Sequence, residues 1–309
     1  WARISIGTMS SAAPSRRSEE VATGLVHGLN RRLLAVTEGR YWAYLLLVPS
    51  LVLIVAVVVY PTLWGMGLSF REMRLNRPDL GTGFVGLKHY YTLINDPIFW
   101  LSLRNTSVWV TGAVAGELPL GLVSALVLNR GLIGFKLFGV LVLLPWFLPN
   151  VVAGHMWALM LEQYKAWFAD PNTALAAAMT VEIWHGFPFF SLLLLAGLKG
   201  IPRDLYEAAA CDGATPWQQF LNVTLPMLKM IIVATVVLRV ISLVNSPDIL
   251  LILTGGGPGR STMVLSLYAF QKANRELNFG YASALSVVMF LLLMGFSWLY
   301  VRLSNVKRD

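Results

Sequence analysis

The sequence predicts an all-α, polytopic membrane protein with six transmembrane helices. Only 13% of its 309 residues are charged and 56% are hydrophobic, whereas soluble domains carry about 25% charged residues. The apolar residues form blocks of about 20, the length that a helix needs to cross roughly 30 Å of hydrocarbon. Alternation with a period of two is absent from these blocks. We therefore expect helices, which satisfy their own backbone hydrogen bonds inside a bilayer.

Six blocks meet this length requirement. The first has no charged residue and starts beside Tyr41 and Trp42, an aromatic pair of the kind found at membrane surfaces. The third also lacks Asp, Glu, Lys and Arg, whereas the second, fourth and fifth contain ionisable residues. The expected spans cover about residues 42–60, 105–128, 137–161, 175–198, 230–253 and 277–301.

The charged residues divide the chain into a membrane domain and two tails. We expect a cytoplasmic N-terminal tail at residues 1–40, the six-helix domain at 41–301 and a cytoplasmic C-terminal tail at 302–309. With both termini inside, fourteen Lys and Arg residues flank the spans on the cytoplasmic side and nine on the other, in line with the positive-inside rule. Topology thus explains the net charge of +8. Basic residues scattered over six loops do not suit a nucleic-acid surface.

Few residues are available for metal, disulfide or catalytic chemistry. Cys211 is the single cysteine and there are four histidines, so a disulfide within the chain and a metal centre of several thiolates are excluded. Residues 255–262 lack the first glycine and the lysine of a phosphate loop. Gly-x-Ser-x-Gly, His-Glu-x-x-His and Cys-x-x-Cys are absent from the sequence. We expect no catalytic residue, no metal site and no enzyme activity.

The loop between the fourth and fifth spans predicts two short helices joined by a sharp bend. Pro202 suits the first position of a helix, and the alanines after it are strong helix formers. Gly213 can adopt the left-handed conformation that ends a helix, and Thr215 and Gln218 have the spacing of a capping box. Pro226 is expected to close the element. The alanine face has little side-chain bulk, so it can enter a groove on another protein.

The same loop carries a longer sequence pattern. It consists of Glu-Ala-Ala, three residues, Gly, nine residues, an aliphatic residue, one residue and Leu-Pro. This pattern resembles the coupling loop, or EAA loop, of ABC importer permeases, with Val223 where isoleucine is usual. Within residues 202–226 the matching positions are Glu207, Ala208, Ala209, Gly213, Leu225 and Pro226.

Other stretches extend the resemblance over the chain from about Tyr41 onward. They lie at residues 84–87, 89–90 and 105–106 near the second span, at 253–259 after the fifth, and at 267–268 and 280–284 near the start of the sixth. Together they are similar to the carbohydrate-uptake permeases of the maltose and glycerol-3-phosphate type. The resemblance implies the type I ABC importer permease fold.

The resemblance also implies a transport mechanism with several partners. Such permeases have no ATPase of their own; two form the pore, and each docks its loop helix on a dimeric nucleotide-binding ATPase that holds ATP and Mg. An extracytoplasmic solute-binding protein delivers the solute, here a sugar-like substrate, for passage across the bacterial cytoplasmic membrane. The second permease is expected to be a different chain, and this chain is expected to bind no cofactor. Docking is expected at Glu207 through Asp212, with Gly213 as the hinge.

Polar residues inside the spans form a second candidate site. Ionisable groups there cost at least roughly 2.5 to 3.5 kcal/mol each on insertion scales, so they usually face a cavity or a partner. Glu182 and His185 share a face of the fourth span, while Arg239, Asn245 and Asp248 follow one row on the fifth. Two such rows would line a polar path. The expected pathway residues are Glu117, Asn150, Glu182, Trp184, His185, Arg239, Asn245 and Asp248.

A packing role is an open alternative for several of these residues. Glu117 and Arg239 can neutralise each other between helices. The aromatic residues around Trp184 can pack in the protein or against lipid instead of stacking on a sugar ring. His185 can be a hydrogen-bonded packing residue.

Two other functions also stay open. A permease for glycerol-3-phosphate or another phosphorylated polyol would use Arg239 as its anion partner. A secondary transporter driven by an ion gradient would use Glu117, Glu182 and Asp248 as proton or sodium sites. A membrane-embedded enzyme would need a nucleophile beside a base, and the sequence shows no such close pairing.

Overall fold

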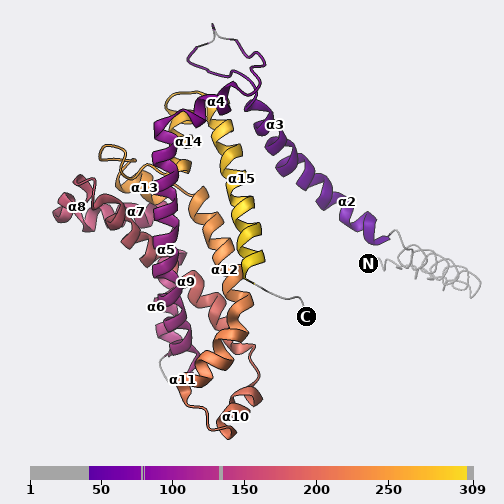
Figure 1. Cartoon of the computed structure of the whole chain (residues 1–309), viewed down its shortest axis with the longest axis vertical. Helices are drawn as coiled ribbons and strands as arrows, with labels where there is room; N and C mark the ends of the chain where they lie inside the picture. The colour runs from indigo at the N-terminus through magenta and orange to yellow at the C-terminus, as the bar shows by residue number, and fades with distance from the viewer. Residues whose placement is uncertain (1–41, 78, 80, 132–134, 305–309) are drawn as a thin grey trace, which may run out of the picture. The chain divides into compact units, whose positions relative to one another are not determined.

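The protein is built of helices (Figure 1). The computed structural model describes residues 42–77, 79, 81–131 and 135–304, so the predicted tail at 1–40 and residues 305–309 lie outside the described part. Within that part no strand forms beyond two isolated backbone bridges, and the all-α prediction is confirmed. The chain divides into two compact units, residues 1–64 and 65–309.

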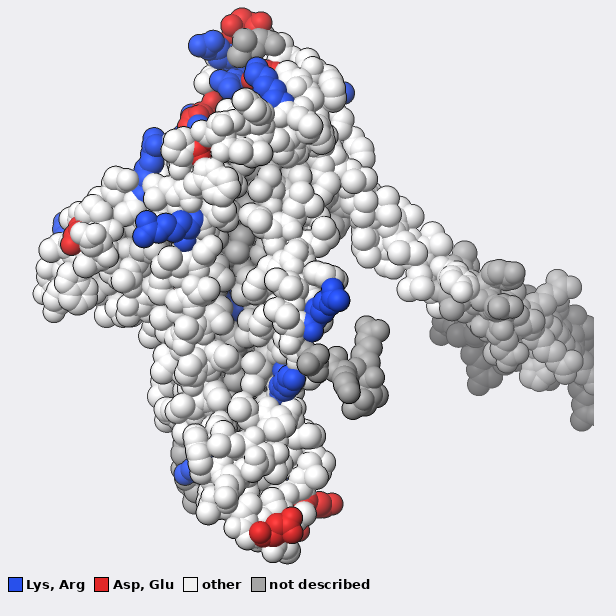
Figure 2. Space-filling view, viewed as in Figure 1, with Lys and Arg blue, Asp and Glu red and all other residues white. Residues whose placement is uncertain are grey.

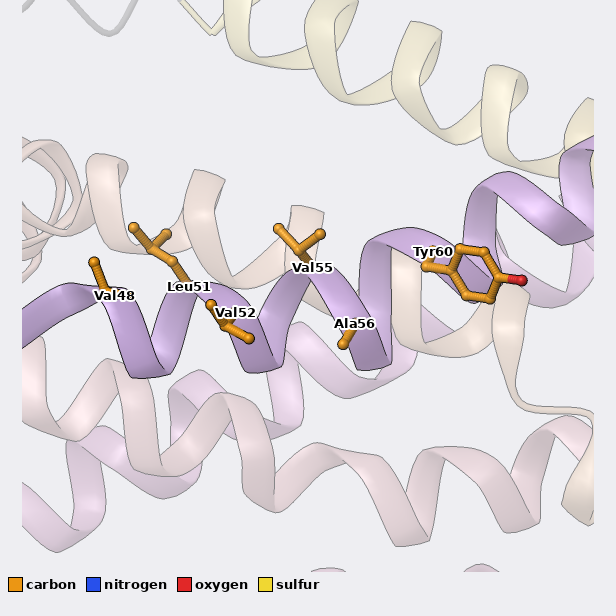
Figure 3. A pocket seen from close by; sticks show the side chains of 6 residues that line it. All are labelled: Val48, Leu51, Val52, Val55, Ala56 and Tyr60. Atoms are coloured by element: carbon orange, nitrogen blue, oxygen red, sulfur yellow. The ribbon is translucent and has the colours of Figure 1, made fainter.

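The described part of the first unit is one apolar helix. It contains α2 (Trp42–Ile54), the π-turn η1 (Val55–Val59) and the start of α3 (Tyr60–Leu68). A candidate span of 23 residues runs along it from Leu46 to Leu68, so the first span continues past its predicted end at residue 60. Figure 3 shows the side chains that line an open apolar groove on this helix, namely Val48, Leu51, Val52, Val55, Ala56 and Tyr60.

A proline accounts for each of two π-turns in the chain. η1 ends two residues before Pro61, and η4 (Phe220–Thr224) ends two residues before Pro226. Proline has no N–H, and in a regular helix its ring collides with the carbonyl four residues earlier. In a π-turn the hydrogen bonds span five residues, as from Leu225 N–H to Phe220 O. The extra residue moves the carbonyl away from the ring, and both helices continue through their prolines.

The second unit contains a bundle of long helices with short helices at its ends (Figure 1). The long helices are α5 (Pro97–Asn129), α9 (Ala174–Lys199), α12 (Leu225–Asn245) and α15 (Phe279–Leu303). At one end lie α4 (Lys88–Ile94) and α14 (Leu265–Asn274), and at the other α10 (Arg203–Cys211) and α11 (Pro216–Gln219). The remaining helices are α6 (Phe135–Phe147), α7 (Asn150–Met160), η3 (Glu162–Tyr164), α8 (Lys165–Ala169) and α13 (Asp248–Leu253).

Glycines allow α5 and α9 to pack closely. A Cβ added to Gly116 would lie 2.5 Å from Ile183 Cδ1, and one added to Gly121 would lie 2.4 Å from Phe190 Cβ. Gly112, one turn before Gly116, faces α9 in the same way. Small residues let two helix backbones approach each other inside a membrane. This approach positions the polar residues of α5 against α9 and α12.

The third predicted span, residues 137–161, is wrong as a single helix. α6 and α7 meet at 96° across a short break at Leu148 and Pro149. Pro149 donates no backbone hydrogen bond, and the residue before a proline avoids helical geometry. The described residues contain five helices long and apolar enough to cross a membrane, or six if this bent pair counts as one span.

The fifth predicted span, residues 230–253, has an earlier start and an internal break. The helix begins at Pro216 and continues through η4 and α12 to Asn245. Ser246 then adopts extended backbone, with φ −106° and ψ 102°, and α13 follows after Pro247. The second span also begins earlier than predicted, at Pro97, whereas α9 and α15 agree with the fourth and sixth spans to within two residues.

A hydrogen-bonded cluster joins α5, α14 and α15 at the end of the bundle that carries α4. Asp96 caps α5, since one of its carboxylate oxygens accepts from Ile98 N–H at 2.9 Å. Its other oxygen accepts from the hydroxyls of Tyr268 at 2.5 Å and Tyr281 at 2.7 Å. Lys272 Nζ lies 5.3 and 5.4 Å from the centres of the two tyrosine rings. One carboxylate thus connects three helices.

Candidate functional site

The loop between α9 and α12 places the EAA residues on an exposed helix. α10 carries Glu207, Ala208 and Ala209, and none of its residues is buried. Pro202 is the N-cap of this helix, with φ −60° and ψ 136°, and not its first helical residue as predicted, because its ψ is extended. Figure 2 shows acidic side chains at this end of the unit.

Gly213 makes the predicted bend. Its φ is +80°, a conformation that costs a residue with a Cβ roughly 1–2 kcal/mol. The N–H of Gly213 donates to Ala210 O at 3.0 Å, and that of Ala214 donates to Ala209 O at 2.9 Å. This pair of bonds is a Schellman motif, which satisfies the last carbonyls of a helix. Asp212 is the C-cap of α10.

The restart after the bend is confirmed, but the predicted stop is wrong. Thr215 N–H donates to Gln218 Oε1 at 2.7 Å and Gln218 N–H donates to Thr215 Oγ1 at 3.4 Å, which completes the capping box of α11. Leu225 and Pro226 do not close the element. They lie at the start of α12, in one helix continuous with α11 through η4, because the π-turn accommodates the proline.

The ionisable residues of the spans form a buried cluster around Arg239. Its Nε donates to Glu117 Oε2 at 2.7 Å and its Nη2 to Glu117 Oε1 at 2.6 Å. The same Nη2 donates to Glu182 Oε1 at 2.6 Å. Glu117 is fully buried, and Glu182 and Arg239 are each 7% exposed. The cluster therefore links α5, α9 and α12 by charge-assisted hydrogen bonds.

Gly186 makes room for this cluster. It lies one helical turn after Glu182 on α9. A Cβ added there would lie 2.1 Å from Arg239 Nη2 and 2.2 Å from Glu117 Oε1, distances that a real side chain cannot adopt. The guanidinium and the Glu117 carboxylate thus occupy the space that a side chain at position 186 would fill.

Asn150 and Asp248 form a separate polar group at two helix breaks. Asn150 Nδ2 donates to Ser246 Oγ and to Asp248 Oδ2, both at 3.1 Å, and Ser246 Oγ donates to Asp248 Oδ2 at 2.8 Å. These bonds join the start of α7 to the break between α12 and α13. The prediction that Asp248 continues the row of Arg239 and Asn245 is wrong, because the helix ends before Asp248.

His185 and Trp184 face the broken segment of α6 and α7. His185 is buried, and its Nε2 lies 3.0 Å from Leu148 O, a carbonyl at the break. The Trp184 ring packs edge-on against Trp157 of α7, with ring centres 5.3 Å apart. Both contacts are of the packing kind that the sequence left open.

Asn245 lines a cleft between α12 and α15. The cleft has a volume of about 360 Å³ and is lined by Ile241, Asn245, Ser286, Met289, Phe290, Leu293, Met294 and Ser297. Asn245 is exposed, and its Nδ2 donates to Ile241 O at 2.8 Å. The amide oxygen of Asn245 takes no part in that bond.

A family comparison identifies the kind of protein that carries these features. Residues 117–308 match the family described as "Binding-protein-dependent transport system inner membrane component". The chain belongs to this family. The permease is 34% identical over 281 residues to the trehalose/maltose transport system permease protein MalF of Thermococcus litoralis, which covers 86% of this chain and 94% of that protein. It is 37% identical over 283 residues to the sulfoquinovosyl glycerol transport system permease protein SmoG of Agrobacterium fabrum, which covers 87% of this chain and 92% of that protein.

Solved structures confirm the predicted fold of the permease. It superposes on a chain of a bacterial ABC transporter that imports the acidic polysaccharide alginate with a TM-score of 0.73 and 20% identity, over 90% of this chain and 100% of that one. The MetNI methionine ABC transporter matches with a TM-score of 0.55 over 72% of this chain and 99% of that one. The fold is that of a type I ABC importer permease, and its apolar helices suit a multi-pass protein of the inner membrane.

The sequence identified these polar residues of the permease, and the pairing of Glu117 with Arg239 that it left open is present in the structure. The eight expected pathway residues fall into the Arg239 cluster, the Asn150 group, the packing contacts of Trp184 and His185, and the cleft at Asn245. Gly186 was missed, although it follows Glu182 by four residues and so lies on the same helix face. Tyr206 and Thr224, which bond across the coupling loop, gave no signal in the sequence.

Proposed function

We propose that this permease moves a sugar or sugar derivative across the bacterial cytoplasmic membrane by alternating access, coupled to a separate ATPase. The observation that carries the proposal is the exposed helix α10, which presents Glu207, Ala208 and Ala209 in front of the Gly213 bend. The names of the relatives, a trehalose/maltose permease and a sulfoquinovosyl glycerol permease, support a sugar-like solute.

The partners follow from the same surface. We assign docking of a dimeric nucleotide-binding ATPase to Glu207, Ala208, Ala209 and Asp212, with Leu225 and Pro226 at the base of the loop. The acidic residues of α10 and its C-cap outnumber the basic ones, so the groove that receives this helix should be basic. A second permease, expected to be a different chain, completes the pore, and an extracytoplasmic solute-binding protein delivers the solute.

The chain itself is assigned no chemical step. ATP and Mg would be bound by the ATPase, and this chain would contribute movement of its helices. Among the described residues, no group of three or more His, Cys, Asp or Glu side chains is arranged to hold a metal ion. With α10 facing the ATPase in the cytoplasm, both termini are also cytoplasmic, as the distribution of Lys and Arg indicates.

The cleft at Asn245 is the part of this chain best suited to meet the solute. An amide and the hydroxyls of Ser286 and Ser297 can bond to sugar hydroxyls, and the exposed Phe290 ring can cover an apolar C–H face of a sugar. Clefts lined mainly by apolar side chains with a few polar groups are typical of small-molecule sites. The second permease would close the cleft from the other side.

The Arg239 cluster favours a sugar over a phosphorylated polyol or a transported ion. Arg239 already bonds to two carboxylates through its Nε and Nη2, so an incoming phosphate would have to displace Glu117 or Glu182. Those two carboxylates are in turn held by the guanidinium and are not free to act as ion sites. We therefore assign Glu117, Glu182 and Arg239 to helix packing and not to the solute path.

Reconstitution tests the function. The permease, purified with its second permease and ATPase in liposomes, is expected to take up radiolabelled sugar only when ATP and the binding protein are both present. Uptake driven by a pH gradient without the ATPase would instead support a secondary transporter. Trehalose, maltose and a sulfoquinovosyl glycerol can be offered in parallel to find the solute.

A matched pair of variants tests the cleft. Asn245→Ala is expected to raise the solute concentration for half-maximal uptake by up to about tenfold, because one hydrogen bond contributes roughly 0.5–1.5 kcal/mol and roughly 1.4 kcal/mol corresponds to a factor of ten. Asn95→Ala is the control, because Asn95 is also exposed and also donates to the carbonyl four residues earlier. If the two variants change uptake equally, the proposal that the solute contacts the Asn245 cleft is wrong.

A further inference from the structure

The coupling helix α10 is attached to the rest of its unit by few contacts. None of its residues is buried, and its backbone continues into the turn at Pro202 and the bend at Gly213. Across the described residues, the hydrogen bond between Tyr206 and Thr224, with 3.0 Å between Oη and Oγ1, is the one side-chain hydrogen bond or ion pair that joins α10 to another element. The Tyr206 ring is half-buried and packs against the core of the unit.

Thr224 is placed to receive a displacement of α10. It is 4% exposed and is the last residue of η4, immediately before α12. Its hydroxyl also lies 3.5 Å from Gln219 O. A π-turn is a local irregularity of a helix and is frequently found at functional sites. Thr224 therefore connects an exposed helix to the irregular base of a long buried one.

From Thr224 the helix leads directly to the ion cluster. α12 carries Arg239 fifteen residues further along, or about 22 Å at 1.5 Å per residue. Arg239 is bonded to Glu117 of α5 and Glu182 of α9. A displacement that enters α12 at its base thus reaches both neighbouring helices through a guanidinium that is bonded to each of them.

We propose that Tyr206 is the positioning residue of the coupling loop, and that its hydroxyl bond to Thr224 transmits movement of the docked helix α10 into α12. The role in transport rests on the proposed function above. The attachment of α10 to the π-turn is a property of this chain alone, so it can be tested without the ATPase.

The first experiment uses the native cysteine as a probe. Cys211 is the single cysteine, it is exposed, and it is the last residue of α10. A nitroxide on Cys211 of the full-length chain in lipid nanodiscs is expected to show a mixed population of immobilised and mobile probe. Tyr206→Phe and Thr224→Val should each lower the ratio of immobilised to mobile probe by about fivefold, the factor that one hydrogen bond supplies. The double variant should be no worse than either single one.

Two controls separate this bond from general loosening. Thr224→Ser keeps a hydroxyl and is expected to restore most of the immobilised population. Tyr91→Phe removes the hydroxyl of a 75%-exposed tyrosine on α4 and is expected to change nothing. If Tyr206→Phe leaves the probe spectrum unchanged, or if the two single effects add in the double variant, the attachment is refuted.

The second experiment measures the number of solute molecules transported per ATP hydrolysed. Tyr206→Phe and Thr224→Val should lower this ratio about threefold to tenfold, with ATP hydrolysis continuing and Thr224→Ser near the unaltered protein. An unchanged ratio in both variants would refute transmission through this bond. If the unaltered permease shows no ATP-dependent uptake at all, the proposed function fails, and the spectra of Cys211 still decide whether Tyr206 positions α10.

Discussion

Arg239 shares one guanidinium between two carboxylates inside the helix bundle. Removing one partner of a buried ion pair leaves a charge in a medium of low dielectric, and typical costs are about 3–5 kcal/mol. The geometry here is favourable, because Glu117 is bidentate and Glu182 bonds to the same Nη2. These distances explain how three ionisable groups can be buried within the spans.

The first prediction ranks substitutions in the cluster. Arg239→Gln should be the most destabilising, by about 3–5 kcal/mol, since it leaves Glu117 and Glu182 buried beside each other without a cation. Glu117→Gln should cost less because Glu182 still pairs with the guanidinium, and Glu182→Gln least because this carboxylate makes one bond and is not fully buried. Thermal unfolding of the purified permease in detergent measures the order. Equal stability of Arg239→Gln and the unaltered chain would contradict it.

The second prediction concerns the glycine beside the cluster. Gly186→Ala should destabilise the protein by about 1–3 kcal/mol, as overpacking does, because the new Cβ would meet Arg239 and Glu117. Gly295→Ala is the matched control. Gly295 lies within a helix with no atom within 4 Å of its added Cβ, so the alanine should stabilise by up to about 1 kcal/mol. Thermal unfolding measures the stability of both variants. If Gly186→Ala leaves the stability unchanged, the helices around the cluster can move apart without cost, and the prediction is wrong.

Prolines of this permease lie both inside continuous helices and at the points where helices break. Pro61 and Pro226 are each preceded by a π-turn and lie within continuous helices. Pro149 and Pro247 instead follow residues that have left the helix, and the chain changes direction or conformation there. Pro119 and Pro188 lie inside α5 and α9 without a π-turn, so an inserted residue is one way, and not the only way, for a helix to continue through a proline.

The third prediction tests the bend of the coupling loop. No atom lies within 4 Å of an added Cβ at Gly213, so Gly213→Ala should cost only the backbone strain of φ +80°, roughly 1–2 kcal/mol. Gly213→Asn should cost less, because asparagine tolerates the left-handed conformation. Hydrogen exchange of the amides of α10 and α11 measures the loss. Faster exchange in the alanine variant than in the asparagine variant is expected, and the reverse order would contradict the argument.

Asp96 connects three helices of the second unit, and its titration predicts a pH range for that connection. Burial by itself would raise the pKa of Asp96, but hydrogen bonds from Tyr268, Tyr281 and Ile98 N–H and the charge of Lys272 lower it below the ordinary 3.8. Burial and the bond to Asp96 raise the pKa of Tyr268 above its ordinary 10.0. The carboxylate contributes stability above pH 3.8 that is lost as pH falls through its lower folded pKa. The phenol contributes stability below pH 10 that is lost as pH rises through its higher folded pKa.

The fourth prediction follows from these signs. The stability difference between the unaltered permease and Asp96→Asn should be constant from about pH 5 to pH 9 and should shrink below about pH 4. Thermal unfolding at a series of pH values measures it. A difference that changes steeply near neutral pH would show that another group controls the connection.

The fifth prediction concerns orientation of the whole chain in the membrane. Cys211 lies at the end of α10 and is exposed, so a membrane-impermeant maleimide should label it in inverted vesicles and not in right-side-out cells. The single cysteine makes the result unambiguous. Labelling from outside the cell would reverse the proposed topology and separate α10 from any cytoplasmic ATPase.

The sequence alone predicted the fold class, most span positions and the local geometry of the coupling loop. These features depend on interactions between residues close in the chain: apolar blocks of membrane length, the positive φ of Gly213, and the capping box of Thr215 and Gln218. Such interactions are encoded within a few residues and can be read without knowing the neighbours of a helix.

Contacts between distant residues were decided only by the tertiary structure. Arg239 meets Glu117 across 122 positions of the chain, and Asn150 meets Asp248 across 98. Helical spacing placed Arg239 and Asn245 on one face of the fifth span, but the glycines of α5 and the breaks at Pro149 and Pro247 determine which faces meet. The bond between Tyr206 and Thr224 likewise exists because the Gly213 bend returns the chain against α10. Which polar groups pair therefore depends on how closely the helices pack and where they break, and neither quantity is contained in a single segment of sequence.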